Sequence, residues 1–501
     1  MKIFTAQQMK VVDRETADQQ CISSFQLMER AAGALLSALS RRFVLSKQRF
    51  VIFCGKGNNG GDGLVLAQYL RQHLARVTVY LLESDSYSKD NLEAQKRNPI
   101  SLIQKFSLDE QLDILTDAVI LDCLFGYGLK RELEVTWNRL VEEINTSVCS
   151  VIAVDMPSGL LSDSPTSREA VVVYADEVLT FQSPKLALLM PENQKFFGSF
   201  EVLDIDLSKD ATDAVDSPYS YVTREDVRLF YKKRKKFDHK GVFGHALIIG
   251  GSHGKIGAVQ LAAKAALRSG CGLLSTYVPE CGYPIIQTAV PEAMVITDVQ
   301  TNLISSMPQV MTYQAVGIGV GMGTDEKTKV AFREFLSASK HPPLVLDADA
   351  LNILAEEPTL LSKIPLHSIL TPHPKELKRI IGNWDNDWHK IEKVKLLAAE
   401  YELHILIKGA NSVIVLPNGM VYFNSTGNVG MATGGSGDVL TGILTALIGQ
   451  GYTAADALRM GVYLHGRAAD IAVQQYGTYG LLPSDIISSL PEAFLELEKG
   501  E

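Results

Sequence analysis

The residues best suited to do chemistry lie in a glycine-rich segment near the C-terminus, Gly427–Gly451, where the run GGSGD precedes an apolar helical pattern. Glycines let the backbone approach a ligand closely, and a helix N-terminus offers free N–H groups and a positive dipole end to an anion. A carboxylate there, Asp438, would repel a phosphate but could take a proton from a hydroxyl group that attacks one. The segment predicts a phosphoryl-transfer site with Asp438 as its catalytic base, and a glycine turn with Asp438 as a simple helix cap is the alternative.

Other polar residues in the same half of the chain follow predicted strands, namely Asp347, Asp349, Asn352, His373, Lys408 and Ser412. The glycine-rich strand ends GGSHG and GIGVGMG add two possible backbone cradles. Taken singly, each polar residue is explained as a helix cap or a surface charge. Because all of them lie at predicted carboxyl ends of strands, on the side of Asp438, we expect them to form one site.

A second set of polar residues occupies the N-terminal half. The segment GKGNNGGDG, Gly55–Gly63, follows a buried strand and precedes a helix, as a phosphate-binding turn requires, although it is neither GxGxxG nor a Walker motif. Two further strand ends carry Asp122, and Asp155 with Ser158. Each carboxylate alone would be a loop cap, but ligands of open parallel sheets lie outside the strand ends, so we expect one site. Its oxygen donors suit a hard cation rather than zinc.

The elements that must position these residues alternate along the chain. Apolar strands such as RFVIFCG, AVILDCLFG and HALIIGG are separated by helical patterns, which is typical of parallel sheets with helices on both faces. A polar stretch with Pro218, residues 207–221, breaks the pattern and is the predicted linker. The sequence therefore predicts an α/β protein of two domains, residues 1–212 and 213–501. The opening helix, from Ala6 to about Ser40, is expected to break near Cys21.

The composition excludes several classes of function. The 501 residues are 46% hydrophobic and carry a net charge of −9, which allows two ordinary cores and argues against nucleic acid as a partner. The basic cluster 232–236 lacks an aromatic stacking pattern and is expected to be a solvated surface or the rim of an anion site. Six cysteines without a CxxC pair indicate free thiols. With no apolar signal segment or membrane-length run, a soluble cytoplasmic protein without membrane contact is expected.

The N-terminal motifs GNNGGDG, DxxFGxG and VDxPSG resemble, in type and order, the signature segments of the NAD(P)H-hydrate epimerases. The resemblance implies a Rossmann-like three-layer sandwich in which Asp155 touches the reacting ring as catalytic acid and base. It also implies a potassium ion held by Asn59, Asp122 and Ser158. The residues implied in binding the hydrated dinucleotide are Asn58, Asn59, Gly60, Gly61, Asp62, Gly126, Tyr127, Gly128, Leu129, Lys130, Arg131, Glu132 and Asp155. The segment FQSPKLALL departs from the family's pattern, so no role is predicted for Lys185.

Residues 239–485 contain the motifs HKG, GGSxxxxGA, PExM, GxGxG, DADALN, TPHP, KGA and GMATGGSGDVLTG. Together they resemble the ADP- or ATP-dependent NAD(P)H-hydrate dehydratases, which implies a ribokinase-like three-layer sandwich. The residues implied in binding the hydrated nicotinamide are Ala258, Gly323, His373 and Asp438. Those implied in binding the nucleotide are Lys408, Gly409, Ala410, Asn411, Ser412 and Gly437. Lys375 stands where the family usually has glycine, and Ser412 replaces its usual threonine but keeps the hydroxyl.

The two resemblances cover essentially the full chain and imply a bifunctional enzyme that repairs hydrated NADH and NADPH. The N-terminal domain would epimerise the R and S hydrates, and the C-terminal domain would dehydrate the S epimer with ADP or ATP as co-substrate. Phosphorylation turns the added hydroxyl into a good leaving group, which the lone pair of the ring nitrogen can expel. Mg²⁺ is expected with the nucleotide. The expected partners are these small molecules, and the expected state is a homo-oligomer.

Two other functions fit the same motifs. The C-terminal domain could be a ribokinase-like small-molecule kinase, whose product keeps the phosphate that a dehydratase would release. The N-terminal domain could be a non-catalytic binding module, as in RNA-decapping scaffolds of the same fold. The intact GNNGGDG motif and the presence of Asp122, Asp155 and Ser158 argue against the second alternative. The choice between ADP and ATP, and between NADH hydrate and NADPH hydrate, stays open.

Overall fold

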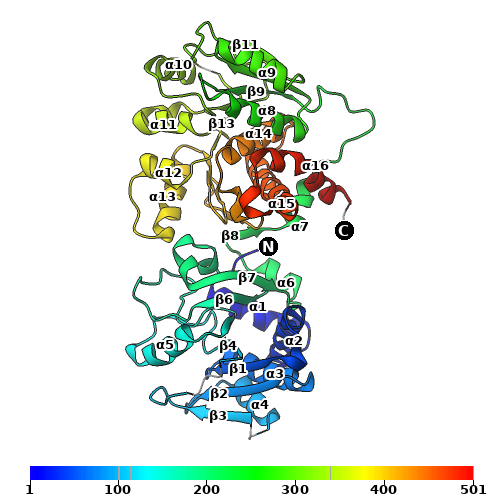
Figure 1. The fold of residues 1–501 in the computed structure, drawn as a ribbon, viewed down its shortest axis with the longest axis vertical. Coiled ribbons are helices and arrows are strands. Elements are labelled where there is room, and N and C mark those ends of the chain that lie inside the picture. Colours follow the sequence, from blue (N-terminus) through cyan, green and yellow to red (C-terminus); the bar gives the residue numbers. More distant parts are fainter. Residues whose placement is uncertain (100–101, 113–115, 339, 500–501) are drawn as a thin grey trace. The chain divides into compact units, whose positions relative to one another are not determined.

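The computed structural model describes residues 1–99, 102–112, 116–338 and 340–499, which form two compact units. The N-terminal unit comprises Lys2–Ser217 with Asn386–Trp388, and the C-terminal unit comprises Met1, Pro218–Asp385 and His389–Glu501. In each unit helices cover a central sheet, and Figure 1 labels these elements along the chain. Each sheet brings the ends of several strands to one edge, where the candidate functional residues lie.

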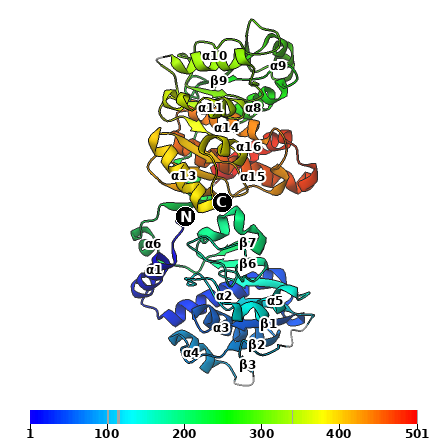
Figure 2. The same cartoon turned by 90° about the vertical axis from the view of Figure 1, so that its left-hand side faces the viewer.

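The N-terminal unit is built on a parallel sheet of seven described strands in the order β3-β2-β1-β4-β5-β6-β7. The strands are β1 (Arg49–Cys54), β2 (Arg76–Leu82), β3 (Ile103–Phe106), β4 (Val119–Cys123), β5 (Ser150–Val154), β6 (Ala175–Phe181) and β7 (Phe197–Leu203). Figure 2 shows strands β3, β2 and β1 following one another towards β6 and β7. The strand order reverses between β1 and β4, which is the switch point of a Rossmann-like fold, where ligands bind.

Helices cover both faces of this sheet. They are α1 (Ala6–Gln19), α2 (Ser24–Arg42), α3 (Asn58–Gln72), α4 (Lys89–Arg97), α5 (Asn138–Thr146) and α6 (Lys209–Ala214). Alternate residues of β1 enter two cores, because Ile52 joins Leu35 of α2 and Leu66 of α3, whereas Phe53 joins Ile144 of α5. The unit is therefore the three-layer α/β sandwich that the sequence predicted (Figure 1).

The two opening helices confirm the predicted break near Cys21, whose φ angle is 52°. Ser23 then starts α2 with a capping box. Its hydroxyl accepts a hydrogen bond from the backbone N–H of Gln26, and the side chain of Gln26 accepts one from the backbone N–H of Ser23. This reciprocal pair satisfies two N–H groups that a helix start otherwise leaves free.

The C-terminal unit has a mixed sheet of ten described strands in the order β11-β10-β9-β12-β13-β14-β15-β16-β17-β8. The strands are β8 (Tyr219–Val222), β9 (His245–Ile249), β10 (Leu273–Val278), β11 (Met294–Thr297), β12 (Ala315–Ile318), β13 (Leu344–Leu346), β14 (Ile369–Leu370), β15 (His404–Ile407), β16 (Val413–Val415) and β17 (Val421–Asn424). All pairs from β11 to β15 are parallel, whereas β15, β16 and β17 pair antiparallel.

The helices of this unit are α7 (Arg224–Phe230), α8 (Ile256–Arg268), α9 (Tyr283–Ala289), α10 (Glu326–Ser337), α11 (Asp349–Glu356), α12 (Pro374–Ile381), α13 (Asp387–Glu400), α14 (Ser436–Gly449), α15 (Ala454–Gly480) and α16 (Pro483–Lys499). Helices α8, α14 and α16 lie on one side of the sheet, and α10 to α13 lie on the other (Figure 1). The unit is therefore a three-layer α/β sandwich, as the sequence predicted.

Helix α14, which begins at the second candidate site, is almost entirely buried. Every one of its residues is buried except Gly437 and Asp438. A Cβ atom on Gly442 would lie 2.0 Å from the carbonyl oxygen of Ala262, so glycine lets α14 and α8 pack backbone against backbone. A helix that is apolar all round belongs in a core, and this one exposes only its first turn.

The boundary between the two units, at Ser217 and Pro218, falls within the expected linker, residues 207–221. This stretch also holds α6 and most of β8, and β8 pairs in parallel with β17 at the sheet edge. One part of the predicted organisation is wrong. The C-terminal series does not simply alternate strands and helices, because β16 and β17 form an antiparallel hairpin around Asn418 and Gly419. Gly419 has a φ of 83°, and an Asn-Gly pair between apolar runs is a strong hairpin signal.

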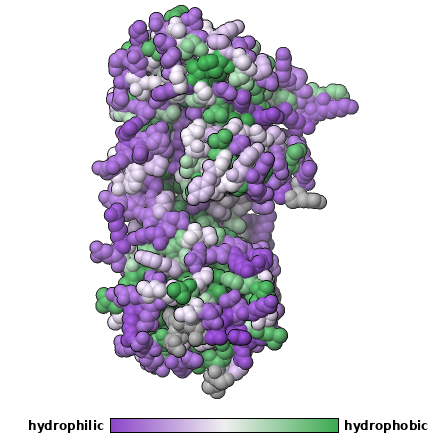
Figure 3. Space-filling view, in the orientation of Figure 1, coloured by the Kyte–Doolittle hydropathy of each residue, from purple (hydrophilic) through white to green (hydrophobic). Residues whose placement is uncertain are grey.

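The basic cluster 232–236 lies away from the predicted phosphoryl-transfer site. The ammonium of Lys232 donates to the carbonyl oxygen of Gly451 at 2.7 Å, just after the C-terminus of α14, whereas Asp438 lies in the first turn of that helix. Lys232 therefore does not line the Asp438 site, and a cation at a helix C-terminus complements the dipole. The face of the molecule in Figure 3 mixes hydrophilic and hydrophobic residues. Among the described helices, none combines the length and the apolar character that crossing a membrane requires.

Candidate functional sites

The first candidate site lies at the switch point of the N-terminal sheet. The connection between β1 and α3 is shorter than the predicted glycine loop, Gly55–Gly63, since α3 already begins at Asn58. A Cβ atom on Gly60 would lie 1.9 Å from the carbonyl oxygen of Gly55, so this turn requires glycine. The predicted binding residues Asn58–Asp62 therefore lie in the first turns of α3, where free N–H groups can bind an anion.

Two of the three residues predicted to hold a cation lie together behind this turn. Ser158 donates from its hydroxyl to one oxygen of Asp122 at 2.6 Å, and from its backbone N–H to the other at 2.8 Å. Both side chains are fully buried, and burial raises the pKa of Asp122 to about 6. Their hydrogen bonds fix the ends of β4 and β5 relative to each other.

The third residue, Asn59, lies beside Asp155 and Gly126. A Cβ atom on Gly126 would lie 2.8 Å from the Asp155 carboxylate and 3.3 Å from the Asn59 amide oxygen. The amide oxygen and nitrogen of Asn59 are buried and have no hydrogen-bond partner among the described residues. Because buried polar groups are normally paired, this amide is a sign of a ligand or ion.

Asp155 follows β5 directly and has a φ of 67°, a strained conformation for a residue other than glycine. Its carboxylate accepts hydrogen bonds from the backbone N–H of Tyr127 at 2.9 Å and from the hydroxyl of Thr180 at 3.3 Å. The ammonium of Lys185 lies 2.5 Å from the same carboxylate. The side chain predicted to touch the reacting ring is therefore held by three neighbouring elements.

Lys185 is a functional candidate for which the sequence analysis predicted no role. Its side chain is 3% exposed, and besides Asp155 it donates to the hydroxyl of Thr180 at 2.9 Å and to the carbonyl oxygen of Phe181 at 3.0 Å. Lysine is rarely buried without a partner. A lone lysine inside the apolar run FQSPKLALL was the signal that could have found it.

These residues surround a cavity of about 1170 Å³, large enough for a cofactor-sized ligand. Its lining includes these predicted residues: Asn58, Asn59, Asp62, Gly126, Tyr127, Gly128, Leu129, Lys130, Arg131 and Asp155. Three other predicted binding residues lie outside the lining. Gly60 and Gly61 are buried in α3, and Glu132 accepts a hydrogen bond from the backbone N–H of Ser167 at 2.6 Å. Glu132 therefore braces a loop.

The second candidate site lies at the N-terminus of α14, in the C-terminal unit. Gly435 is the N-cap with a φ of 98°, and a Cβ atom there would lie 2.7 Å from the side chain of Leu261. Asp438 is half-buried, and among the described residues no hydrogen bond to its carboxylate is found. Burial raises the pKa of Asp438 to about 6, and the negative charge of Asp347 adds to that rise while Lys408 opposes it.

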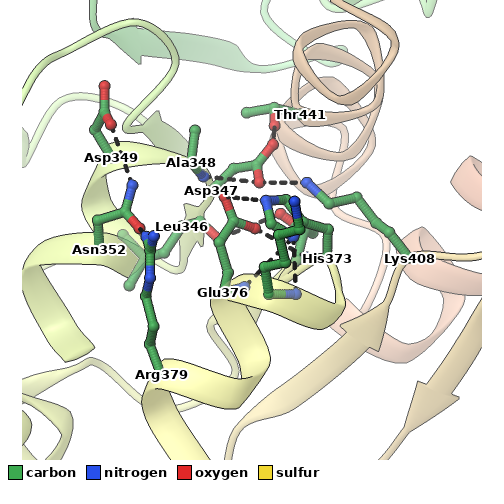
Figure 4. Close-up of polar contacts among 12 residues, drawn as sticks. Leu346, Asp347, Ala348, Asp349, Asn352, His373, Glu376, Arg379, Lys408 and Thr441 are labelled. Carbon is green, nitrogen blue, oxygen red and sulfur yellow. Dashed lines mark hydrogen bonds and ion pairs between the residues drawn. The ribbon is translucent and has the colours of Figure 1, made fainter. Parts of the chain in front are cut away.

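Asp347 holds Lys408 next to this helix (Figure 4). The Lys408 ammonium lies 2.7 Å from one oxygen of Asp347, and the hydroxyl of Thr441 in α14 donates to the other oxygen at 2.8 Å. A Cβ atom on Gly437 would lie 3.3 Å from the Lys408 ammonium, so the lysine stands over the first turn of α14. The site thus combines a cation, free helix N–H groups and an unpaired carboxylate.

The segment from Lys408 to Ser412 is a turn between two antiparallel strands, β15 and β16. The hydroxyl of Ser412 donates to the carbonyl oxygen of Gly409 at 3.0 Å and so closes the turn. Gly409, Ala410 and Asn411 lie within it. Five of the six residues predicted to bind the nucleotide therefore lie together at the carboxyl end of β15, and the sixth, Gly437, lies in α14.

His373 is the N-cap of α12. Its Nδ1 atom accepts hydrogen bonds from the backbone N–H groups of Lys375 at 3.0 Å and Glu376 at 3.4 Å (Figure 4). Burial lowers the pKa of His373, and the positive charge of Lys408 lowers it further. The other ring nitrogen, Nε2, lies 3.4 Å from a carboxylate oxygen of Glu376.

Gly323 and Ala258, also predicted to bind the hydrated nicotinamide, lie on one side of this site. The backbone N–H of Gly323, at a φ of 81°, donates to Asp349 at 2.8 Å. Ala258 lies at the start of α8, 3.1 Å from where a Cβ atom on Gly321 would stand. Asp349 also accepts from Asn352, which in turn accepts from Arg379 (Figure 4). Asp349 therefore shapes the glycine segment through its backbone.

The fold and the sites define a two-domain α/β protein, in which a Rossmann-like unit with a cofactor-sized cavity is fused to a second α/β unit. In the second unit a glycine-rich helix start lies beside a lysine and an unpaired carboxylate. The family described as NAD(P)H-hydrate dehydratase matches residues 246–492, and the family described as YjeF-related protein N-terminus matches residues 24–187.

Curated relatives match over the whole chain. A bifunctional NAD(P)H-hydrate repair enzyme of Moorella thermoacetica is 34% identical, over 100% of this chain and 98% of its own length. The enzyme of the same name from Escherichia coli is 32% identical, over 97% of this chain and 93% of its own. A solved structure of the ADP/ATP-dependent NAD(P)H-hydrate dehydratase of Bacillus subtilis is 30% identical, covering 56% of this chain and 98% of its own, with a TM-score of 0.48. The chain belongs to the family of bifunctional NAD(P)H-hydrate repair enzymes.

Proposed function

We propose that this chain repairs hydrated NADH and NADPH, with ADP or ATP as co-substrate. The N-terminal unit interconverts the R and S epimers of the hydrate, and the C-terminal unit dehydrates the S epimer. The observation that carries the proposal is the unpaired carboxylate of Asp438 in the first turn of α14, beside the ammonium of Lys408. The names of the relatives that match over the whole chain support both activities.

In the C-terminal unit, Asp438 takes the proton from the hydroxyl group on ring carbon six, and the oxygen attacks the terminal phosphoryl group of the nucleotide. The N–H groups that open α14 and the Lys408 ammonium stabilise the transferred phosphoryl group. The carbon–oxygen bond then breaks with its electrons on phosphate, the ring nitrogen supplies its lone pair, and a proton leaves the neighbouring carbon. The dihydropyridine double bond is restored.

The residues of this site suit a magnesium ion that is shared with the nucleotide phosphates. Mg²⁺ in such sites usually has one or two carboxylate ligands and otherwise phosphate and water oxygens. Within the described residues no group of three or more His, Cys, Asp or Glu side chains gathers as a full metal site. Asp347 would be the protein ligand, Asp438 would stay free to act as the base, and the ion would offset the charge on the phosphates.

In the N-terminal unit, Asp155 is the group that we assign to proton transfer with the oxygen bound to ring carbon six. Lys185 holds its carboxylate from one side and the Tyr127 backbone holds it from another. The cavity lining formed by Asn58, Asp62 and the loop from Gly126 to Arg131 would bind the dinucleotide. Burial raises the pKa of Asp62 well above its usual range, and the charges of Asp155, Asp13 and Asp90 add to the rise.

A potassium ion would complete the N-terminal site, held by Asn59, Asp122 and Ser158. The buried, unpartnered amide of Asn59 supports an oxygen-binding cation there. One carboxylate with amide and hydroxyl oxygens carries less negative charge than Ca²⁺ sites usually gather, so a monovalent ion fits better. Anomalous scattering from crystals soaked in rubidium or thallium tests this directly. No heavy-ion peak within reach of Asp122 would overturn the assignment.

The full chain tests the proposed function when it is given a mixture of R and S hydrates with ADP or ATP. We expect absorbance of the restored dihydropyridine to account for both epimers, with one phosphate released for each molecule repaired. Phosphate that stays attached to the ring would identify a kinase instead. Persistence of the R epimer, with the S epimer consumed, would show that the N-terminal unit is not an epimerase.

A further inference from the structure

A second polar pair lines the N-terminal cavity, apart from Asp155 and Lys185. Asp13, on helix α1, accepts a hydrogen bond from the phenol of Tyr127, with 3.0 Å between the two oxygens. Both residues belong to the lining of the cavity. No motif in the sequence pointed to Asp13, and the function proposed above gives it no role. A carboxyl group at the wall of a binding cavity is a candidate for proton transfer.

Tyr127 connects this pair to the first one. Its backbone N–H donates to Asp155 at 2.9 Å, and its hydroxyl donates to Asp13, so a single residue spans two carboxylates. The Lys185 ammonium lies 5.7 Å from the centroid of the Tyr127 ring. The Asp155 carboxylate and the Tyr127–Asp13 pair, which can both exchange protons, therefore lie at different points of one cavity wall.

The charges around Asp13 suit proton exchange near neutral pH. Burial raises the pKa of Asp13 to about 6, the hydrogen bond from Tyr127 and the charge of Lys185 oppose the rise, and Asp155 adds to it. Burial also raises the pKa of the Tyr127 phenol above its usual range, and Asp13 and Asp155 add to that rise. The phenol therefore keeps a proton at rest, while Asp13 can be found with or without one.

The chemistry of epimerisation requires two such groups. When the hydroxyl group leaves as water from one face of the ring, water must return on the other face to give the other epimer. A proton donor or acceptor must lie within hydrogen-bonding reach of the oxygen that it serves. One carboxyl group cannot reach oxygens on both faces of the ring.

We propose that Tyr127 and Asp13 form a second acid–base centre of the N-terminal site, with Tyr127 as the catalytic residue and Asp13 as the positioning residue that exchanges its proton. The inference rests on the epimerase activity proposed above. Tyr127 protonates the departing hydroxyl oxygen and is reprotonated by Asp13. The carbon–oxygen bond breaks with both electrons on oxygen, and the lone pair of the ring nitrogen forms a carbon–nitrogen double bond.

Water then adds to the carbon from the other face. Its proton passes to Asp155, and the electrons of the carbon–nitrogen double bond return to nitrogen. One water leaves and one water is added, and Asp155 gains the proton that Asp13 has lost. Exchange with solvent resets both groups, and the reverse epimerisation runs the same steps backwards.

The test uses the full chain without nucleotide, so that epimers interconvert but are not dehydrated, and separates them by chromatography. We expect Tyr127→Phe to lower kcat by about 10²-fold with little change in KM, since the ring and the backbone contacts stay. Asp13→Asn keeps an oxygen that can accept from the phenol but cannot exchange a proton. The limb of the pH–rate profile near pH 6 should therefore disappear in this variant.

Matched controls are Tyr69→Phe on α3 and Glu15→Gln on α1, which remove the same groups outside the cavity lining. Both should interconvert epimers as the wild type does. Calorimetric binding of NADP⁺ checks that each variant still forms the dinucleotide site. If Tyr127→Phe does not bind NADP⁺, the pH profile of Asp13→Asn decides.

The outcomes separate this inference from the proposed function. A wild-type protein that does not interconvert the epimers refutes the epimerase activity itself. An active wild type together with a fully active Tyr127→Phe variant refutes the second acid–base centre alone. An Asp13→Asn variant that is slower but keeps the wild-type limb near pH 6 would make Asp13 merely structural and overturn its assignment.

Discussion

The two units each hold a lysine paired with an aspartate at strand ends, but they hold it differently. In the N-terminal unit the partners Lys185 and Asp155 are 3% and 4% exposed, and the ammonium has three protein acceptors. In the C-terminal unit Lys408 is 21% exposed, and Asp347 is the single acceptor that the described part of the chain offers its ammonium. An ammonium group has three donors, so Lys185 is fully used by the protein, whereas Lys408 keeps donors for a ligand.

The carboxylates assigned to chemistry differ in the same sense. Asp155 accepts from Lys185, Thr180 and the Tyr127 backbone, while Asp438 stands at the start of α14 without such partners in the described chain. The comparison teaches that the N-terminal unit orients its charged groups before substrate arrives. The C-terminal unit leaves its base and its cation open to a charged ligand, as phosphoryl transfer requires.

The largest difference between the Lys185–Asp155 pair and the Lys408–Asp347 pair is expected in the stability of the fold. It should appear in the variant Lys185→Met. This variant leaves the Asp155 carboxylate buried without its cation, and breaking a buried pair in this way costs about 3–5 kcal/mol of folding free energy. Urea denaturation followed by circular dichroism measures the loss. Lys408→Met is the matched variant and should cost much less stability but weaken nucleotide binding in calorimetry. Equal losses of stability in Lys185→Met and Lys408→Met would contradict the inference that the two lysines are held differently.

Asp438→Asn should show the next largest effect. Losing the general base should lower the rate of dehydration of the S epimer by about 10²-fold, while nucleotide affinity and epimer interconversion stay near wild type. Absorbance of the restored dihydropyridine, followed over time with purified S hydrate, measures the rate of dehydration. Glu334→Gln, at an exposed position of helix α10 in the same unit, is the control. Near-normal turnover of Asp438→Asn would remove Asp438 from the mechanism.

Much of this arrangement could be predicted from the sequence. The strand-end motifs and the helical patterns between them predicted the two α/β sandwiches, and GGSGD predicted the exposed first turn of α14. These features are local, because a glycine turn and an apolar period are visible within a few residues. The edge strand β8 was missed because its alternation of Tyr and Ser lies next to a polar stretch.

The missed site residues depend on contacts between segments far apart in the chain. Asp13 meets Tyr127 only after α1 lies against the sheet, and Lys185 meets Asp155 across neighbouring strands β5 and β6. Neither residue has neighbours in sequence that reveal its partner. Asp347 was recognised as a polar strand end, but its bond to Lys408 joins residues that are 61 positions apart. Long-range pairing of this kind follows from topology rather than from local pattern.

A moderate effect is expected on the pH dependence of dehydration, which tests the assignment of Asp438 as the open base of the C-terminal site. Asp438 acts as a base only when ionised, and its pKa is raised to about 6, so the rate should fall as the pH drops through 6. The charge of Asp347 contributes to that rise. Asp347→Asn should therefore lower the pKa of Asp438 and move the acid limb of kcat/KM to lower pH. Glu356→Gln on α11 should leave the limb in place, and an upward shift in Asp347→Asn would contradict the assigned charges.

The smallest effect is expected at Lys375, where the C-terminal site uses backbone and not side chain. The Lys375 side chain is exposed, whereas its N–H donates to Nδ1 of His373 at 3.0 Å. Lys375→Gly keeps that N–H and restores the glycine usual in the family, so we expect turnover within about twofold of wild type and a stability loss of at most about 1 kcal/mol. Lys375→Pro removes the N–H and should raise KM for the hydrated dinucleotide, because His373 loses part of the bond that orients its ring. Steady-state kinetics on both variants decide between backbone and side chain. A large loss of turnover in Lys375→Gly would mean that the Lys375 side chain binds substrate. Part of the affinity of the C-terminal site would then come from a residue that differs from the glycine usual in the family.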